Sequence, residues 1–152
     1  MAARHRTRCR TAGAALALAL AAVLTGCNGG YDSPSDTASK AESAVESATA
    51  EAQRRLDDIQ DGVDVKGDVK AGPTTVGSDG RARTEVTVNN TDDAARSFAV
   101  QVNFTDSGNQ LIDTVIVTVN QVQPNHTATA TARSTHDLSG KVQSDIARAV
   151  RY

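Results

Sequence analysis

The stretch that decides the fold is SFAVQVNFT, residues 97–105. Its larger apolar side chains stand at every second position, Phe98, Val100, Val102 and Phe104. A period of two places one set of side chains on a buried face of a strand and the other set on the opposite face. The stretch therefore predicts a half-buried β-strand.

The rest of residues 63–152 carries the same signature. Seventeen of the 21 Val, Ile, Leu and Phe residues in this range are β-branched, which favours strands over helices. Further strands are expected in VDVKGDV (63–69), RTEVTVN (83–89), LIDTVIVTV (111–119) and HTATATARS (126–134). In RTEVTVN, Thr84, Val86 and Val88 are expected on one side. We expect 111–119 at the centre of a sheet because it is apolar on both faces, and the Thr/Ala strand near an edge.

The C-terminal stretch KVQSDIARAVRY, residues 141–152, fits two structures. At strand spacing it places Val142, Ile146, Val150 and Tyr152 on one side, whereas a helix would align Val142, Ile146 and Ala149. We favour the strand.

Turn compositions separate these stretches, namely GSDGR (77–81), NNTDD (89–93), DSGN (106–109) and QPNH (123–126). Six or seven short strands at this spacing predict a mainly β fold, a small immunoglobulin-like β-sandwich over residues 63–152. The prediction rests on spacing, because the Cys and Trp markers of immunoglobulin domains are absent.

Residues 86–132 resemble the FxLYD-type domains of bacterial lipoproteins. They show a strand, an Asn-rich turn, an alternating strand that ends in Asp106, an apolar strand, a Pro turn and a Thr/Ala strand. Val102–Asp106 stands where the family has Phe-x-Leu-Tyr-Asp, and the Asp agrees. The resemblance implies an immunoglobulin-like fold outside the cytoplasmic membrane, with no established reaction.

Residues 36–62 predict a helix, because they are rich in Ala, Glu, Gln and Arg and contain no Gly or Pro before Gly62. Its apolar face is weak, since most of its members are alanine. We interpret it as a solvated stalk; a coiled coil and a disordered segment are the alternatives.

The N-terminus has the layout of a secretory signal. Arg4, Arg6, Arg8 and Arg10 precede the apolar block 14–24, which is shorter than the roughly 20 residues of a membrane span. The following Leu24-Thr25-Gly26-Cys27 resembles the bacterial lipobox. The resemblance implies cleavage between Gly26 and Cys27 and a diacylglyceryl group on the Cys27 sulfur, and two acyl chains suffice for stable anchoring.

The domain boundaries follow from these assignments. We expect a signal peptide at 1–26, a lipidated cysteine and flexible leash at 27–35, a helical stalk at 36–62 and a β-sandwich at 63–152. Cys27 would be the single cysteine of the processed chain, so an internal disulfide is excluded.

Charge argues against nucleic acid as a partner. The whole chain has 16 basic and 18 acidic residues, and loss of the four leading arginines leaves 12 against 18, a net charge of −6. A negative surface disfavours phosphate backbones and anionic lipids.

We find no pattern that predicts catalysis. His126 and His136 are too few for a zinc site, Ser107-Gly108 has no neighbouring histidine in sequence, and the acids Asp57, Asp58 and Asp61 are typical of a solvated helix end. We therefore expect no enzyme activity, no metal and no cofactor.

The expected function is that of a monomeric, membrane-anchored extracytoplasmic lipoprotein with a non-catalytic binding or spacer module. The Thr/Ala strand, residues 127–132, is the candidate edge for an extended peptide or envelope protein partner. The alternative is an accessory subunit of an envelope enzyme or transport complex.

Overall fold

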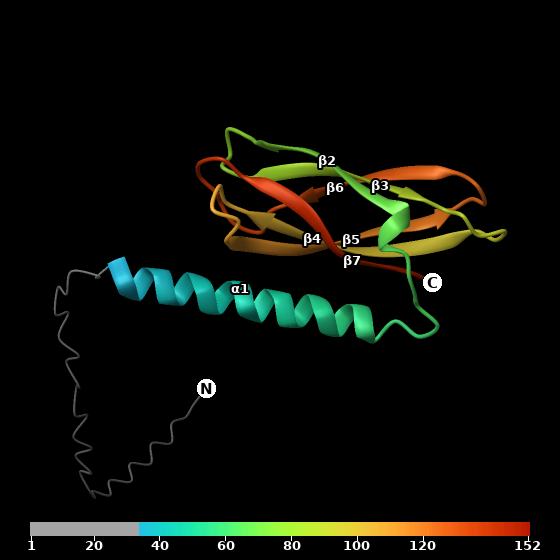
Figure 1. The fold of residues 1–152 in the computed structure, drawn as a ribbon, viewed down its shortest axis with the longest axis horizontal. Coiled ribbons are helices and arrows are strands. Elements are labelled where there is room, and N and C mark those ends of the chain that lie inside the picture. The colour runs from blue at the N-terminus through green and yellow to red at the C-terminus, as the bar shows by residue number, and fades with distance from the viewer. Residues whose placement is uncertain (1–33) are drawn as a thin grey trace, which may run out of the picture. The chain divides into compact units, whose positions relative to one another are not determined.

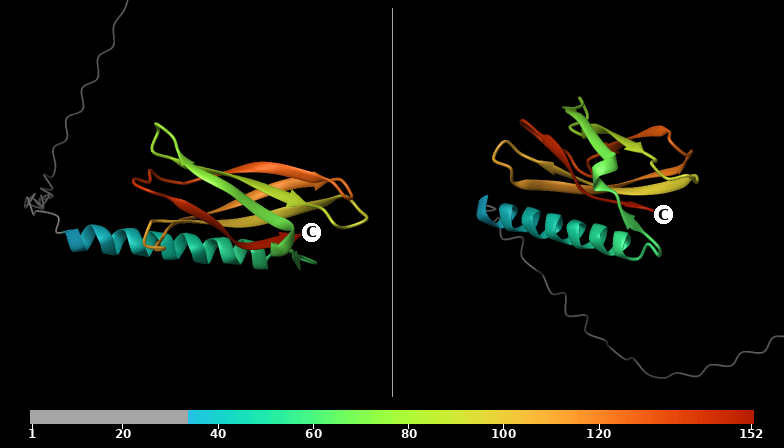
Figure 2. Two further views of the ribbon diagram at one scale, coloured as in Figure 1. Left: turned by 45° about the horizontal axis from the view of Figure 1, so that its top comes forward. Right: turned by 45° about the vertical axis from the view of Figure 1, so that its right-hand side comes forward.

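Residues 34–152, the part of the chain that the structure describes, form three layers, one helix and two antiparallel β-sheets (Figure 1). This computed structural model describes the backbone of residues 34–152 and the side chains of residue 40 and residues 42–152. The helix α1 lies along the outer face of one sheet, and the second sheet covers the inner face, as two further views confirm (Figure 2). The described chain is therefore mainly β, as the sequence predicts.

The seven strands divide into a four-stranded sheet in the order β1-β7-β4-β5 and a three-stranded sheet in the order β2-β3-β6. Their bounds are β1 Val63–Asp64, β2 Val69–Val76, β3 Ala82–Asn89, β4 Arg96–Thr105, β5 Leu111–Val122, β6 Thr127–Arg133 and β7 Gln143–Arg151. Every pairing is antiparallel.

The main core lies between the two sheets and follows the alternation in the sequence. In β3 the buried residues are Ala82, Thr84, Val86 and Val88. They face Phe98, Val100, Val102 and Phe104 of β4, all fully buried. These two strands were predicted correctly, including the residues that face inward.

β4 differs from the prediction of a half-buried strand, because its outer face is covered as well. Ala99 and Gln101, on the face away from the other sheet, are both buried. Ala99 belongs to a second apolar cluster with Leu56 of α1 and Val150 of β7. The helix that buries this face cannot be inferred from the alternation of β4 itself.

The helix α1, Pro34–Asp57, begins two residues before the predicted start and ends five residues before the predicted end. Ala52 and Leu56 on its inner face are buried, and Ile59 beyond its end packs against the same cluster. The C-terminal half of α1 is thus part of the packed structure, unlike a fully solvated stalk. Helix and sheets form one compact unit.

The helix ends where the chain must turn back to the sheet. Asp61 has a φ of 60°, and Gly62 lies so close to β7 that an added Cβ would stand 2.5 Å from Cγ1 of Val150. Gly62 is therefore required by close packing rather than as the helix cap.

The predicted single strand 63–69 is wrong. The chain pairs with β7 at Val63 and Asp64, and the Val65 amide donates to the Ala149 carbonyl at 2.9 Å. It then forms the 3₁₀ turn Lys66–Asp68, and β2 begins at Val69 in the other sheet. β2 continues through Gly72 and Pro73, a pair that argues against a strand in the sequence. It is tolerated because β2 is an edge strand with a register shift between Ala71 and Thr74.

β5 lies at the edge of its sheet, not at the centre as predicted. Its second apolar face exists because α1 crosses it, and Ile116 packs against the helix cluster. An edge strand that is covered by a helix is apolar on two faces, and so is a central strand. The sequence pattern therefore could not distinguish the two positions.

The C-terminal stretch is a strand, β7, as predicted, but its residues do not share one face. The register shifts between the pairs Gln101–Arg148 and Val102–Ile146, which leaves Ala147 as an extra residue. Ile146 and Ala149 consequently enter the main core, while Val150 faces the helix. A β-bulge of this kind reverses the alternation.

The predicted turns are confirmed, and β6 lies at the edge of its sheet as predicted. At 77–81 the Gly77 amide donates to the Arg81 carbonyl at 2.9 Å, and Gly80 adopts a φ of 71°. At 106–110 the Asp106 amide donates to the Gln110 carbonyl at 3.0 Å, and Asn109 has a φ of 61°.

Candidate functional site

The expected lipidation site Cys27 and the cleavage site between Gly26 and Cys27 lie outside the described residues. So do the expected signal peptide and most of the leash. Within residues 34–152, no helix combines the length and the apolar composition that a membrane crossing requires.

The two histidines of the β domain lie at opposite ends of β6. His126, in the turn before the strand, places Nδ1 2.8 Å from the carbonyl oxygen of Pro124. His136, beyond the other end of the strand, places Nε2 3.1 Å from the carbonyl oxygen of Ile112. Among the described side chains, no group of three or more His, Cys, Asp or Glu is placed to hold a metal ion.

Ser107 and Gly108 lie in the β4–β5 turn. The Asp106 carboxylate accepts hydrogen bonds from the amides of Gly108 at 2.8 Å and Gln110 at 2.9 Å. A side chain that folds back on its own backbone in this way is an Asx turn, and it organises the hairpin.

The acids at the end of α1 differ in their surroundings, because one is paired with a strand and another faces solvent. Asp57 forms an ion pair with Arg148 of β7, which fastens the helix end to the sheet. Asp58 is exposed. The helix end is thus held by one charged contact in addition to the Leu56 cluster.

A buried carboxylate that sequence analysis missed lies at the other end of the sheet. Asp113 of β5 is 1% exposed and accepts hydrogen bonds from the Thr135 amide at 2.6 Å and the Thr135 hydroxyl at 3.0 Å. The sequence indicated that Asp113 would be buried, because in a strand it lies on the same face as Val115, Val117 and Val119, which face the core.

The Asp113 cluster also holds His136. Nε2 donates to the Ile112 carbonyl, and the Thr135 hydroxyl lies 3.1 Å from Nδ1. The Asp113 carboxylate stays 3.7 Å from Nδ1, beyond hydrogen-bond distance. The carboxylate therefore does not orient the imidazole as in a catalytic triad; the cluster fixes the segment that follows β6.

An exposed charge cluster joins the β2–β3 turn to β6. Asp79 accepts hydrogen bonds from Nη1 of Arg83 at 3.1 Å and from Nη2 of Arg133 at 2.9 Å. The Arg83 contact, followed by that of Arg133, holds the pKa of the Asp79 carboxyl well below its usual range. The cluster ties two strands of one sheet together.

The candidate peptide edge, β6, is paired on one side only. Residues 127–133 form a continuous ladder with β3, and among the described strands no other pairs with β6. Its threonines are exposed, whereas Ala128, Ala130 and Ala132 face the core. The neighbouring element on the open side is β5, in the opposite sheet.

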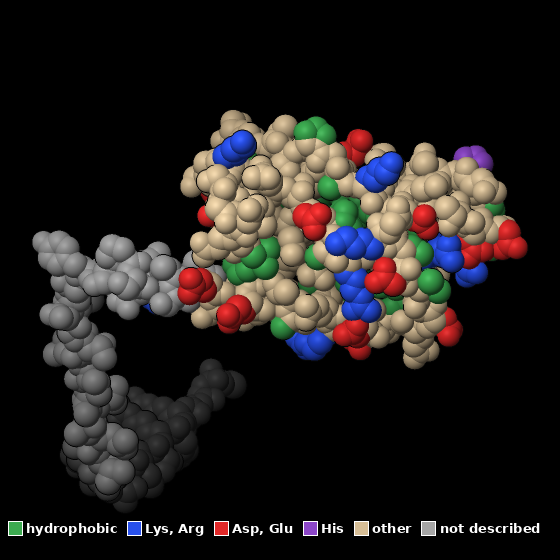
Figure 3. Space-filling model, viewed as in Figure 1, with side chains coloured by type: hydrophobic (Ala, Val, Ile, Leu, Met, Phe, Trp, Pro, Cys, Tyr) green, Lys and Arg blue, Asp and Glu red, His purple; other side chains and the backbone are tan. Residues whose placement is uncertain are grey.

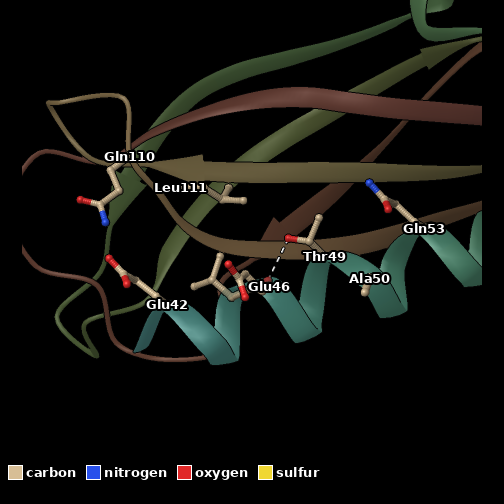
Figure 4. A pocket seen from close by; sticks show the side chains of 8 residues that line it. Glu42, Glu46, Thr49, Ala50, Gln53, Gln110 and Leu111 are labelled. Carbon is tan, nitrogen blue, oxygen red and sulfur yellow. Dashed lines mark hydrogen bonds between the residues drawn. The ribbon is translucent and has the colours of Figure 1, made fainter. Parts of the chain in front are cut away.

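A groove of about 430 Å³ lies between α1 and the start of β5. The helix contributes Glu42, Glu46, Thr49, Gln53 and apolar Val45 and Ala50, and the sheet contributes Gln110 and Leu111 (Figure 4). Across one end of the groove, Glu42 and Gln110 point toward one another (Figure 4). Leu111 lines the side opposite the helix.

A second hollow of about 500 Å³ shares Glu42, Val45, Gln110 and Leu111 with the first. It extends toward the Asp113 cluster and adds Asp106, Ile112, His136, Asp137, Leu138 and others. In the space-filling view, acidic side chains stand beside a hydrophobic patch near the start of α1 (Figure 3).

The described residues thus provide two candidate binding surfaces, the open edge of β6 and the groove beside α1. The sequence pointed to the edge, but the groove depends on how the helix lies against β5, which no local pattern encodes. No protein-family model, no curated protein and no solved structure matches the chain.

Proposed function

We propose that the chain is a lipid-anchored extracytoplasmic protein whose β domain is a non-catalytic binding module. The observation that carries the proposal is the sequence Leu24-Thr25-Gly26-Cys27, which follows four arginines and a short apolar block. Lipidation would also remove the single thiol of the processed chain, which would otherwise be open to oxidation outside the cytoplasm.

The proposal includes an immunoglobulin-like topology for the two sheets. If β2, β3, β4, β5, β6 and β7 are equated with immunoglobulin strands A, B, C, C′, E and F, the sheets read A-B-E and F-C-C′. These orders agree with the immunoglobulin arrangement. The short β1 then takes the place of strand G beside strand F.

We further propose that the domain stays close to the membrane instead of being raised on a stalk. Six residues separate Cys27 from Pro34, where α1 begins. Seven steps of extended chain span at most roughly 25 Å. The end of α1 is packed on the sheet. The segment that would separate the membrane from the β domain therefore consists of this leash and the first turns of the helix.

Binding, not catalysis, is the activity that the described surfaces support. The open edge of β6 offers backbone groups to an extended peptide, and the groove beside α1 offers apolar surface with charged margins. The polar clusters at Asp113 and Asp79 serve the fold, because their hydrogen-bond partners belong to neighbouring strands and loops.

Metabolic labelling with an alkyne analogue of palmitate tests the anchor. Wild-type chain and the Cys9→Ser variant should be labelled and should sediment with membranes, because Cys9 leaves with the signal. Cys27→Ser should lose both the label and membrane retention after carbonate washing. Equal labelling of Cys27→Ser and wild type would refute the proposal.

A further inference from the structure

We propose that the groove between α1 and β5 binds a positively charged amphipathic peptide segment of a partner protein. This inference deepens the proposed binding function and rests on it.

The floor of the groove is apolar and accessible. Val45 and Leu111 are partly buried where α1 and β5 diverge, and Ala50 lies further along the helix. Leu138 and Ile112 continue the apolar surface into the second hollow. An occupant would therefore insert apolar side chains between the helix and the strand, as amphipathic helices do in hydrophobic grooves.

The margin of the groove carries one sign of charge. Its acids are Glu42, Glu46, Asp106 and Asp137, and no lysine or arginine is among the described residues that line either hollow. Glu42 and Glu46 form no ion pair with any described residue, whereas Asp137 pairs with Arg81 at 3.0 Å. An apolar floor beside Glu42 and Glu46, which have no ion-pair partner among the described residues, is complementary to a segment that presents Leu-like anchors beside Lys or Arg.

The same charges disfavour two other occupants. A second copy of this chain would bring a processed net charge of −6 and the same acidic margin. Anionic lipid headgroups would be repelled for the same reason. The two hollows, about 430 and 500 Å³, are each large enough for a few side chains of a peptide.

Fluorescence anisotropy with a defined probe tests the inference. The probe is a fluorescent amphipathic peptide, LKKLLKLLKKLLKL, titrated with the full chain, purified with or without lipid on Cys27, at one constant concentration of neutral detergent. A peptide in which every Lys is replaced by Glu serves as the matched probe control. We expect saturable binding of the basic peptide and none of the acidic one.

Two double variants with the same change in charge separate the groove from the general surface. Glu42→Gln with Glu46→Gln should weaken binding of the basic peptide roughly three- to tenfold. Asp58→Asn with Glu85→Gln, two exposed acids outside the groove, should leave it unchanged. Val45→Thr, which keeps the side-chain shape, should weaken binding without altering the charge.

Three outcomes would overturn the inference. Equal weakening by both double variants would mean non-specific attraction to a negative protein, and no weakening by either would place the peptide elsewhere. Self-association of the free chain that disappears in the Glu42/Glu46 variant would assign the groove to a second copy. None of these readouts depends on the state of Cys27, so failure here is distinguishable from failure of the lipid anchor.

Discussion

Leu56 of α1 and Val150 of β7 are buried in one apolar cluster, with exposed fractions of 2% and 3%. Ala99 of β4 completes the buried part of the cluster, and Ile59 and Ile116 border it. This cluster joins the helix to β7 and β4, the two inner strands of the four-stranded sheet. It makes α1 a third layer of the domain.

Leu56→Ala should destabilise the domain by about 2 kcal/mol, the lower end for such truncations, because the cluster is small. The loss should be read from urea unfolding followed by far-UV circular dichroism. Gln53→Ala, at an exposed position of the same helix, is the control and should change stability little. A helix independent of the sheet would give the same stability for Leu56→Ala and the control.

Gly62→Ala should destabilise the protein by about 1–3 kcal/mol, because the new Cβ would stand 2.5 Å from Val150 Cγ1 and 3.2 Å from the Ile59 carbonyl oxygen. Gly67→Ala is the matched control, since nothing lies within 4 Å of its added Cβ. The control should be neutral or slightly stabilising, through the entropy of the unfolded chain. Thermal unfolding of the two variants side by side measures the difference, and equal melting temperatures would contradict the described packing.

Asp113→Asn should cost about 2–3 kcal/mol, because the amide replaces an acceptor that takes charge-assisted hydrogen bonds from the Thr135 amide and hydroxyl. The Thr135 amide should also exchange with solvent faster, which hydrogen exchange measures residue by residue. Asp145→Asn, at an exposed site on β7, is the control. Unchanged exchange at Thr135 would show that Asp113 does not hold the segment.

Asp79→Asn should lower the melting temperature at neutral pH. The difference in melting temperature between the variant and wild type should become smaller in acid. The folded pKa of Asp79 is lowered, first by Arg83 and then by Arg133, while the unfolded value is about 3.9. A lowered pKa contributes stability that is present above the unfolded value and lost as the pH falls toward the folded value. Between neutral pH and about pH 4 the difference in melting temperature should therefore stay constant, and from about pH 4 to pH 3 it should begin to narrow. A difference that does not change below about pH 4 would exclude the ionised pair as its cause.

Alternation alone identified β3 and β4 with the correct inward residues, because both strands keep a strict period of two. It also identified β6 as a thin strand at an edge. Local patterns succeeded where the alternating apolar side chains of a strand all face the main core.

The errors have physical causes that lie outside local sequence. The bulge at Ala147 reverses the faces of β7, and the helix over β5 imitates the pattern of a central strand. Pro73 made the sequence of β2 look unlike a strand. The proline is tolerated because β2 lies at an edge, and the position of a strand in its sheet is not encoded locally. The groove beside α1 is lined by residues of the helix and of the start of β5, which lie far apart in the sequence. From the sequence alone, its acids look like ordinary solvated helix positions.

The proposed lipid anchor would determine where every surface described above operates. The intact mass of the mature protein, purified from membranes in detergent, tests it most directly. We predict a chain that begins at residue 27 and carries the added mass of a diacylglyceryl group on Cys27. An unmodified Cys27, or a chain that retains Arg4–Arg10, would contradict it.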